Sequence, residues 1–303
     1  MNKVSVIITT YNSENTIHNT LSSILNQDGI NEKFELEIIV IDDCSTDNTY
    51  EIVKEYDDVI FLSTGKNSGG PNKGRNIGLE TSSGDYICIT DHDDEWHSDR
   101  IKKVLPQLIK VPIVSSGYTL FDRTDNKKIE RVKDSNEPYI YYEKDVTFIK
   151  CLSKSRKGQG VYLGSLIFRK ELAHIKFEEQ YGVVDFDWLV RLFQGQDSIE
   201  ICESLYTRLV DGGNLSLDKT YRERDFEYSL LFLKTYENEY PYEVREAIQR
   251  INGSRARYFY LMGDMVNARH YFRKSSMDVK TLAYLITTFV GASFVKKYFK
   301  VFG

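Results

Sequence analysis

The chain has 303 residues, enough for one large domain or two. Of these residues, 41% are hydrophobic and 28% are charged, which is ordinary for a soluble globular protein. The net charge of -5 argues against a nucleic-acid-binding protein, because such proteins usually have a strongly basic balance.

The first 110 residues alternate short apolar runs with segments of helical character. The run from Val4 to Ile8 is rich in β-branched residues and is typical of a buried strand. Strands are expected at residues 4–8, 37–41, 59–62 and 85–90, and helices at 13–25, 45–56 and 74–79. This alternation predicts an α/β fold with a parallel sheet and right-handed crossovers.

After about residue 110 the pattern changes. Strands are expected at 113–121 and 199–209, helices at 143–152 and 185–193, a loop with short strands at 122–142 and a flexible basic segment at 153–160. From about residue 218 the chain is expected to be helical to its end. Residues 255–275 resemble one tetratricopeptide-like hairpin with a turn at Gly263-Asp264, and one such unit cannot form a solenoid. We therefore expect a C-terminal helical appendage.

Three carboxylates follow the strand expected at 85–90 within four positions, at Asp91, Asp93 and Asp94. Strand ends in α/β proteins are where ligands bind, and clustered carboxylates raise one another's pKa unless a cation compensates them. Oxygen ligands of this kind suit Mg²⁺ or Mn²⁺, usually completed by substrate phosphates. The alternative is a solvated acidic turn.

Four segments in order resemble glycosyltransferases of family 2 with the GT-A fold. They are Val4-Ser-Val-Ile-Ile-Thr-Thr-Tyr-Asn12, Ile41-Asp-Asp-Cys-Ser-Thr-Asp-Asn-Thr49, Gly74-Arg-Asn-Ile-Gly78 and Asp91-His-Asp-Asp94. The resemblance covers about residues 1–215. It implies a transferase domain with a mostly parallel central sheet, a nucleotide-binding half at 1–110 and an acceptor half at 111–215, followed by the helical region at 216–303.

The resemblance implies a nucleoside diphosphate sugar as donor, with a UDP-sugar the most frequent in this family. Residues expected to bind the nucleotide are Thr9, Tyr11, Asp42, Asp43, Lys73, Arg75 and Asp91. Tyr11 offers a stacking face for the base, and Asp43 can accept a hydrogen bond from a base N–H. The cations Lys73 and Arg75 can contact the base or neutralise the diphosphate. Alternatives are a surface aromatic for Tyr11 and an exposed helix arginine for Arg75.

The resemblance also places the metal and the general base. Asp93 is the first choice as ligand for Mn²⁺ or Mg²⁺, with Asp91 and Asp94 beside it, and His92 is expected to point away. Trp96 either walls the sugar pocket or belongs to the core.

The base position of the family falls on Asp185, although the Glu that usually precedes it is Val184 here. Asp187 is the rival base, and a structural acid at a helix N-terminus is the alternative for Asp185.

The segment Tyr206 to Ser216 resembles the closing loop of the family. Many members carry a His here that meets the metal or the diphosphate, whereas this chain has Asp211 nearby and Arg208, which could contact the phosphates. The double glycine at 212–213 favours a mobile lid.

Charge is unevenly distributed along the chain. From Arg269 to the end there are seven Lys or Arg residues and one acid, a net charge of +6 on an otherwise acidic chain. The apolar part at about 282–295 is too short to span a bilayer, so it either lies in a membrane interface or packs on the preceding hairpin. Four scattered cysteines and a first apolar run too short for a signal peptide predict a cytoplasmic protein, either free or peripheral at the inner face of the cytoplasmic membrane.

The resemblance implies an inverting, metal-dependent hexosyltransferase (class EC 2.4). It would move a sugar from a nucleotide-sugar to a hydroxyl of a glycan or lipid-linked glycan in bacterial surface polysaccharide synthesis, such as capsule or lipopolysaccharide. The alternatives are a sugar-nucleotide pyrophosphorylase, although Tyr11-Asn-Ser-Glu replaces its basic glycine-rich loop, and a non-catalytic nucleotide- or glycan-binding scaffold. The sequence identifies neither the sugar, the acceptor, the linkage nor the oligomeric state.

Overall fold

The computed structural model describes residues 1–181, 185–210 and 219–290. The chain divides into two compact units, one made of residues 1–148 and 157–225 and the other of residues 149–156 and 226–303. The division expected at residues 215 and 216 falls in a segment outside the described residues, so it stays a prediction.

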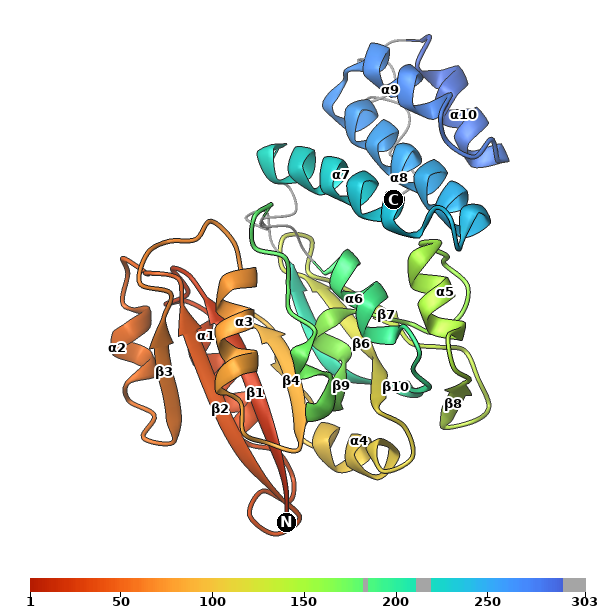
Figure 1. Cartoon of the computed structure of the whole chain (residues 1–303). Helices are drawn as coiled ribbons and strands as arrows, with labels where there is room; N and C mark the ends of the chain where they lie inside the picture. The colour runs from red at the N-terminus through yellow and green to blue at the C-terminus, as the bar shows by residue number, and fades with distance from the viewer. Residues whose placement is uncertain (182–184, 211–218, 291–303) are drawn as a thin grey trace. The chain divides into compact units, whose positions relative to one another are not determined.

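The first unit is built on one ten-stranded sheet (Figure 1). Its strands are β1 (Asn2–Thr10), β2 (Phe34–Asp42), β3 (Val59–Ser63), β4 (Tyr86–Asp91), β5 (Glu95–Trp96), β6 (Ile113–Asp122), β7 (Lys127–Arg131), β8 (Tyr139–Tyr142), β9 (Ile167–Arg169) and β10 (Ser198–Val210). The order is β3-β2-β1-β4-β9-β6-β10-β5, with β7 on β6 and β8 on β10. Strands β1 to β4 are mutually parallel and β10 is parallel to β6, which confirms the predicted mostly parallel sheet at the centre.

Helices alternate with the first four strands, as the sequence pattern predicted, and three more follow between β5 and β10. They are α1 (Ile17–Leu25), α2 (Thr49–Val53), α3 (Asn72–Thr81), α4 (Arg100–Leu108), α5 (Val146–Leu152) and α6 (Phe186–Phe193). The expected helix at 45–56 is shorter than predicted, because the Asp47 carboxylate accepts hydrogen bonds from the Thr49 amide and hydroxyl at its start. Helix α4 and strand β9 were not predicted, although Ile101, Val104, Leu105 and Leu108 have helical spacing.

Two glycines bring helix α3 close to the sheet. A Cβ atom at Gly78 would lie 2.3 Å from Ile7 Cγ2, and one at Gly74 would lie 2.9 Å from Thr9 Cγ2. Neither position has room for a side chain, so the helix backbone packs directly on β1 and β2. This close approach holds Arg75, the residue after Gly74, beside the end of β1.

At the opposite end of these strands, Glu37 ties β1, β2 and the turn before β4 together. Its carboxylate forms an ion pair with Lys3 and accepts hydrogen bonds from the Ser5 hydroxyl and the Ser83 amide. Burial opposes ionisation, but these donors outweigh it and lower the pKa of Glu37 to about 2. Through these contacts, Glu37 connects the first half of β2 to the start of β1 and to the turn before β4.

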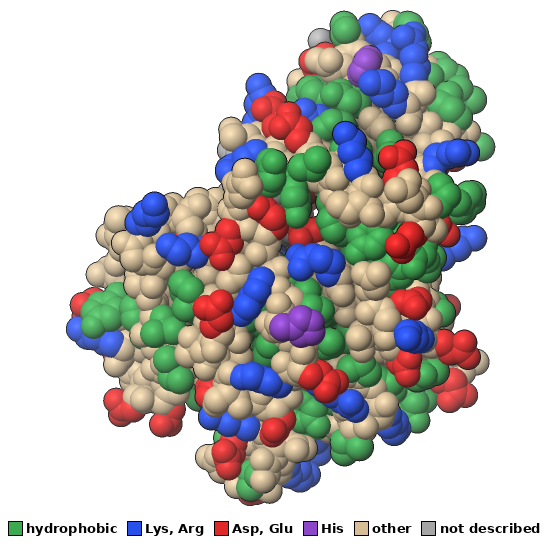
Figure 2. All heavy atoms as spheres, in the orientation of Figure 1, with side chains coloured by type: hydrophobic (Ala, Val, Ile, Leu, Met, Phe, Trp, Pro, Cys, Tyr) green, Lys and Arg blue, Asp and Glu red, His purple; other side chains and the backbone are tan. Residues whose placement is uncertain are grey.

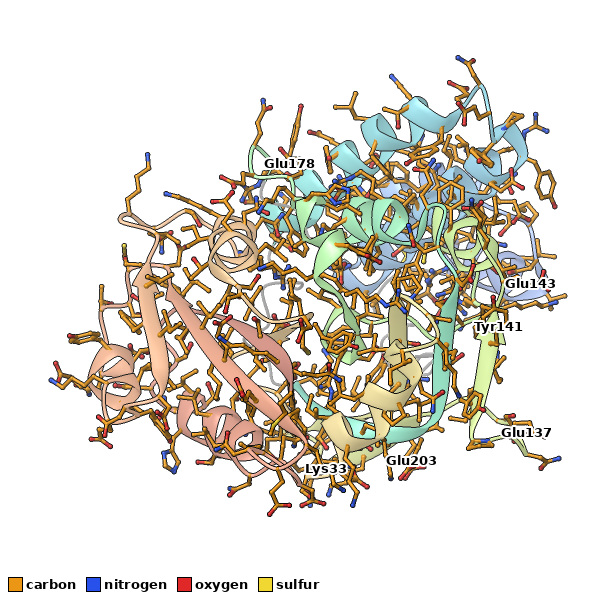
Figure 3. All side chains as sticks on the ribbon, turned by 60° about the horizontal axis from the view of Figure 1, so that its bottom comes forward. Lys33, Glu137, Tyr141, Glu143, Glu178 and Glu203 are labelled. Atoms are coloured by element: carbon orange, nitrogen blue, oxygen red, sulfur yellow. The ribbon has the colours of Figure 1, made fainter. Side chains whose placement is uncertain are left out.

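The outer part of the sheet is held by polar contacts at its rim. Glu203 of β10 lies beside α4 and pairs with Lys103 (Figure 3). Tyr141 of β8, labelled in the same view, donates a hydrogen bond to Asp197 at 2.9 Å. The short strands β7 and β8 fall in the segment where the sequence predicted a loop with short strands.

The second unit is helical. Helix α7 (Lys219–Leu233) leads into it, and α8 (Pro241–Met262), α9 (Met265–Phe272) and α10 (Val279–Thr287) follow. Gly263 ends α8 with a φ of 85° and Asp264 caps α9, so the predicted hairpin turn is confirmed. A core of Ala256, Tyr260, Met265, Ala268, Phe272 and Tyr284 joins the last three helices. Within the described ranges, no helix is long and apolar enough to cross a membrane.

Candidate functional site

The ends of three parallel strands place the predicted polar residues at one edge of the sheet. In the strand register, Thr10 of β1 lies opposite Asp42 of β2, and Thr9 lies opposite Asp91 of β4. A pocket of about 850 Å³ opens at this edge. A volume of this size fits a ligand of nucleotide-sugar size.

The structure brings most of the predicted site residues into this pocket. Those that line it are Thr9, Tyr11, Asp43, Arg75, Asp91, Asp93, Asp185 and Arg208. Those described but not among its lining residues are Asp42, Lys73, Asp94, Trp96 and Asp187. Asp211 lies outside the described residues. The assignment of each to a ligand stays a prediction.

At one end of the pocket, Tyr11 is 46% exposed while its backbone is held firmly. The next residue, Asn12, has a φ of 50°, accepts a hydrogen bond from the Thr46 amide and donates one to the Ser45 hydroxyl. The Tyr11 ring therefore projects from a fixed loop with a free face available for stacking.

The two neighbouring acids after β2 have different surroundings. The amide and hydroxyl of Ser45 both donate to the Asp42 carboxylate, so Asp42 builds the turn that follows the strand. Both Asp43 oxygens accept from the Ser68 amide at 2.9 Å, and the Thr64 hydroxyl also donates to one of them. Asp43 thus fixes the glycine-rich loop at 65–70 against the pocket.

The two cations of α3 also differ. Arg75 is 3% exposed, its guanidinium forms an ion pair with Asp91 at 3.1 Å, and it lies over the Phe177 ring. Lys73 instead donates to the Thr64 carbonyl at 2.7 Å. Arg75 is therefore the helix cation that reaches the acidic cluster.

Asp91, Asp93 and Asp94 form a potential cation site. Each offers a carboxylate oxygen, and the three oxygens lie within 4.8 Å of one another. Asp94 is 1% exposed, and its Oδ2 has no hydrogen-bond partner among the described residues. Burial and then the neighbouring carboxylates raise the pKa of Asp94 well above its usual range, and burial also raises the pKa of Asp93. An oxygen-only set with an orphaned buried oxygen fits Mg²⁺ or Mn²⁺.

His92 is turned toward helix α1. Its Nδ1 lies 3.1 Å from the Thr16 hydroxyl, and its carbonyl accepts from Thr20. It is not among the three residues that could hold an ion. Trp96 is a core residue, 5% exposed, with its indole N–H directed at the Thr90 hydroxyl.

Asp185 lies just before helix α6, and Asp187 lies in the first turn of that helix. Asp185 is the N-cap residue, lines the pocket, and its carbonyl accepts from the Leu189 amide at 2.8 Å. Asp187 is 2% exposed and pairs with Arg191 at 2.7 Å. The Arg191 guanidinium also donates to the Lys176 carbonyl, so this ion pair braces the helix. The geometry favours Asp185 over Asp187 as the residue that can reach a substrate.

The pocket is also lined by residues that the sequence did not single out, among them Arg123, Tyr162 and Tyr221. Arg123 follows β6 and its amide donates to the Val210 carbonyl. Tyr221 on α7 is buried, which together with the Asp185 carboxylate raises its pKa. No spacing distinguishes these two tyrosines among the 21 in the chain.

Comparison with known proteins gives a consistent picture. The model of the family described as "Glycosyl transferase family 2" matches residues 5–173. The poly(ribitol-phosphate) beta-N-acetylglucosaminyltransferase TarS of Staphylococcus aureus is 42% identical over 105 residues, which cover 34% of this chain and 18% of TarS. The putative teichuronic acid biosynthesis glycosyltransferase TuaG of Bacillus subtilis is 30% identical over 180 residues, covering 56% of this chain and 69% of TuaG. The matched segment spans less than a fifth of the length of TarS.

Two solved structures share the fold. The structure of S. aureus TarS residues 1–349 in complex with UDP-GlcNAc superposes with a TM-score of 0.67 at 20% identity, covering 99% of this chain and 94% of that one. A mannosyltransferase from Pyrobaculum calidifontis in complex with GDP-Man and Mn²⁺ superposes with a TM-score of 0.58 at 17% identity, covering 99% and 88%.

Proposed function

The chain belongs to glycosyl transferase family 2 and has the GT-A fold, and we propose that it transfers a sugar from a UDP-sugar to a hydroxyl of a glycan or lipid-linked glycan. One observation carries this proposal: a single pocket gathers an aromatic ring, a buried arginine, clustered carboxylates and a separate carboxylate on a helix N-terminus. These are the groups that a nucleoside, a diphosphate with a cation, and an acceptor hydroxyl require.

The proposed reaction inverts the anomeric carbon. The Asp185 carboxylate takes the proton of the acceptor hydroxyl, and the hydroxyl oxygen forms a bond to the anomeric carbon. The bond from that carbon to the diphosphate oxygen breaks on the opposite face, and its electron pair leaves with UDP. Asp185 has the position for this role because it lines the pocket from the N-terminus of α6, where the helix dipole stabilises a negative charge.

The leaving diphosphate requires positive charge. Arg75 supplies one cation beside Asp91. Asp91, Asp93 and Asp94 would hold Mn²⁺ or Mg²⁺, which when bound neutralises charge on the phosphates as a Lewis acid. Tyr11 would stack on the base, with Asp43 and Thr9 beside it.

The names of the relatives support a bacterial surface glycan as acceptor. TarS is named for transfer to poly(ribitol-phosphate), and TuaG for teichuronic acid synthesis. We extend this class of acceptor to the present chain and place its action at the cytoplasmic side, where nucleotide-sugars are made.

The proposal is tested by thermal unfolding with UDP, GDP and their sugars, with and without Mn²⁺. One UDP-sugar is expected to raise the melting temperature by several degrees in a metal-dependent way, since saturation at 100 times Kd adds about 2.7 kcal/mol. That donor should then release UDP when acceptor is added. Release of pyrophosphate would instead favour the pyrophosphorylase, and binding without turnover of any donor would favour the scaffold.

The second unit suggests where an anionic membrane surface could contact the protein. Val279, Leu282 and Ile286 of α10 and Phe289 and Val290 just beyond its end are exposed, with Val279 at 86% and Phe289 at 69%. On the helices of the second unit, Lys and Arg side chains lie among hydrophobic ones (Figure 2). The described segment 269–290 contributes four Lys or Arg residues and one acid. We propose that these exposed apolar side chains lie in the interface of an anionic membrane, and that the Lys and Arg side chains of residues 269–290 contact the lipid headgroups.

Vesicle sedimentation tests this contact. The protein is expected to bind phosphatidylglycerol vesicles, to bind phosphatidylcholine vesicles weakly, and to dissociate at high salt. Ile286→Glu with Phe289→Glu should lower the bound fraction about tenfold, because two charges then enter the interface. Ile109→Glu is the matched control, since Ile109 is also 69% exposed but lies in the first unit. Equal binding by both variants would refute the contact.

A further inference from the structure

A stack of cations and aromatic rings runs from the core to the pocket. The Arg208 guanidinium lies 4.7 Å from the centre of the Tyr162 ring. Tyr162 stacks on Tyr206 with centres 6.0 Å apart and an interplanar angle of 15°. On the inner side, the Arg100 guanidinium lies 5.3 Å from the Tyr206 ring and 4.2 Å from the Trp96 ring. Two guanidinium groups therefore bracket a stacked pair of tyrosines.

The inner end of this stack is fixed. Arg100 is fully buried and donates to the Gly164 carbonyl at 2.6 Å. Tyr206 is fully buried as well, and a Cβ at Gly164 would lie 2.9 Å from its hydroxyl oxygen. Neither side chain can shift without displacing its neighbours, so the Tyr162 ring rests on a rigid support.

The outer end faces the acidic cluster. Tyr162 and Arg208 both line the pocket, and the Asp94 and Asp91 carboxylates are among the charges that act on Arg208. Arg208 takes part in none of the ion pairs found among the described residues, and its side chain lines the pocket where a ligand could reach it. The guanidinium lies against the face of the Tyr162 ring, which is itself supported from below.

We propose that Tyr162 is a positioning residue that holds the Arg208 guanidinium ready for the donor diphosphate. This inference rests on the proposed function. An arginine side chain has rotamer freedom to lose on binding. A ring face that already restrains it removes part of that cost, and adds a cation–π attraction. The benefit should appear with a diphosphate ligand and be small with a ligand that lacks the second phosphate.

The experiment is calorimetric titration of UDP and UMP, with Mn²⁺ present, into the wild-type protein and its variants. Tyr162→Leu is expected to weaken UDP binding about tenfold and UMP binding much less, because the variant loses the cation–π contact that restrains the guanidinium. Tyr162→Phe retains the ring and should restore UDP affinity to within about threefold of the wild type. Arg208→Gln should have the same selective effect, and adding Tyr162→Leu to it should cause little further loss.

Tyr118→Leu is the matched control. Its ring contacts both Tyr162 and Tyr206, with centres 5.2 and 5.7 Å away, but it does not line the pocket. This variant should lose stability while the ratio of UDP to UMP affinity stays unchanged. An unchanged ratio in Tyr162→Leu, or additive losses in the double variant, would overturn the positioning role and leave the proposed function intact. Absence of UDP binding by the wild-type protein would overturn both.

Discussion

Replacing Asp185 by asparagine is expected to lower kcat about 1,000-fold, because the acceptor hydroxyl then has no base to take its proton. Donor binding should change little. The groups expected to bind the donor diphosphate are Arg75 on α3 and the acidic cluster at the end of β4, whereas Asp185 lines the pocket from the start of α6. The measurement is UDP release from the donor in the presence of acceptor, alongside titration of UDP.

Asp187→Asn is the control for this variant. Asp187 is two positions further along α6 and pairs with Arg191, so its loss should lower stability more than chemistry. If Asp185→Asn retained kcat within tenfold while Asp187→Asn abolished it, the two roles would have to be exchanged. If both variants kept full activity, neither residue would be the base.

Asp93→Asn is expected to remove the metal-dependent part of UDP binding. The three carboxylate oxygens within 4.8 Å form one site, so losing one ligand should weaken Mn²⁺-dependent affinity at least about tenfold. Chelation by EDTA should have the same effect on the wild-type protein and little further effect on the variant. Glu95→Gln, a neighbouring acid outside the cluster, is the control. Equal UDP affinity with and without Mn²⁺ in the wild type would contradict the metal site.

The same site gives a pH dependence of known sign. Burial and neighbouring carboxylates raise the pKa of Asp94 and Asp93 in the metal-free fold, so acid protonates them there before it would in the unfolded chain. The contribution of these two groups to the stability of the metal-free protein should therefore rise as pH falls through their raised pKa values toward 3.8, and Asp93→Asn with Asp94→Asn should remove it. Metal binding requires the ionised form, so the Mn²⁺-dependent increase in melting temperature should shrink over the same range.

The predictable part of the fold lies where local sequence determines it. Val4 to Ile8 had to be a buried strand because of its composition, and Asp91 to Asp94 stood out because carboxylates rarely end an apolar strand without a purpose. The parallel topology predicts that these two segments lie close together, since the carboxyl ends of parallel strands share one edge of the sheet.

The remaining site depends on tertiary contacts. Tyr162 and Tyr221 enter the pocket from segments far from the strand ends, and their neighbours in sequence show no periodicity that marks them. Lys73 and Arg75 are two positions apart on one helix but bind different partners. Lys73 donates to the Thr64 carbonyl and Arg75 pairs with Asp91, and only the folded structure shows which partner each one contacts. Likewise, the Arg191 pairing that occupies Asp187 depends on helix geometry in the folded protein.

The stacked rings give the molecule an optical property. The chain has two tryptophans. Trp96 ends the stack that reaches the pocket through Arg208, and Trp188 lies parallel to Phe177, with ring centres 4.4 Å apart, beneath the Arg75 guanidinium. Each indole is therefore linked through stacked groups to a pocket arginine, Trp96 to Arg208 and Trp188 to Arg75. Intrinsic fluorescence can thus report ligand occupancy without any attached dye, and single Trp→Phe variants would separate the signals from the two indoles.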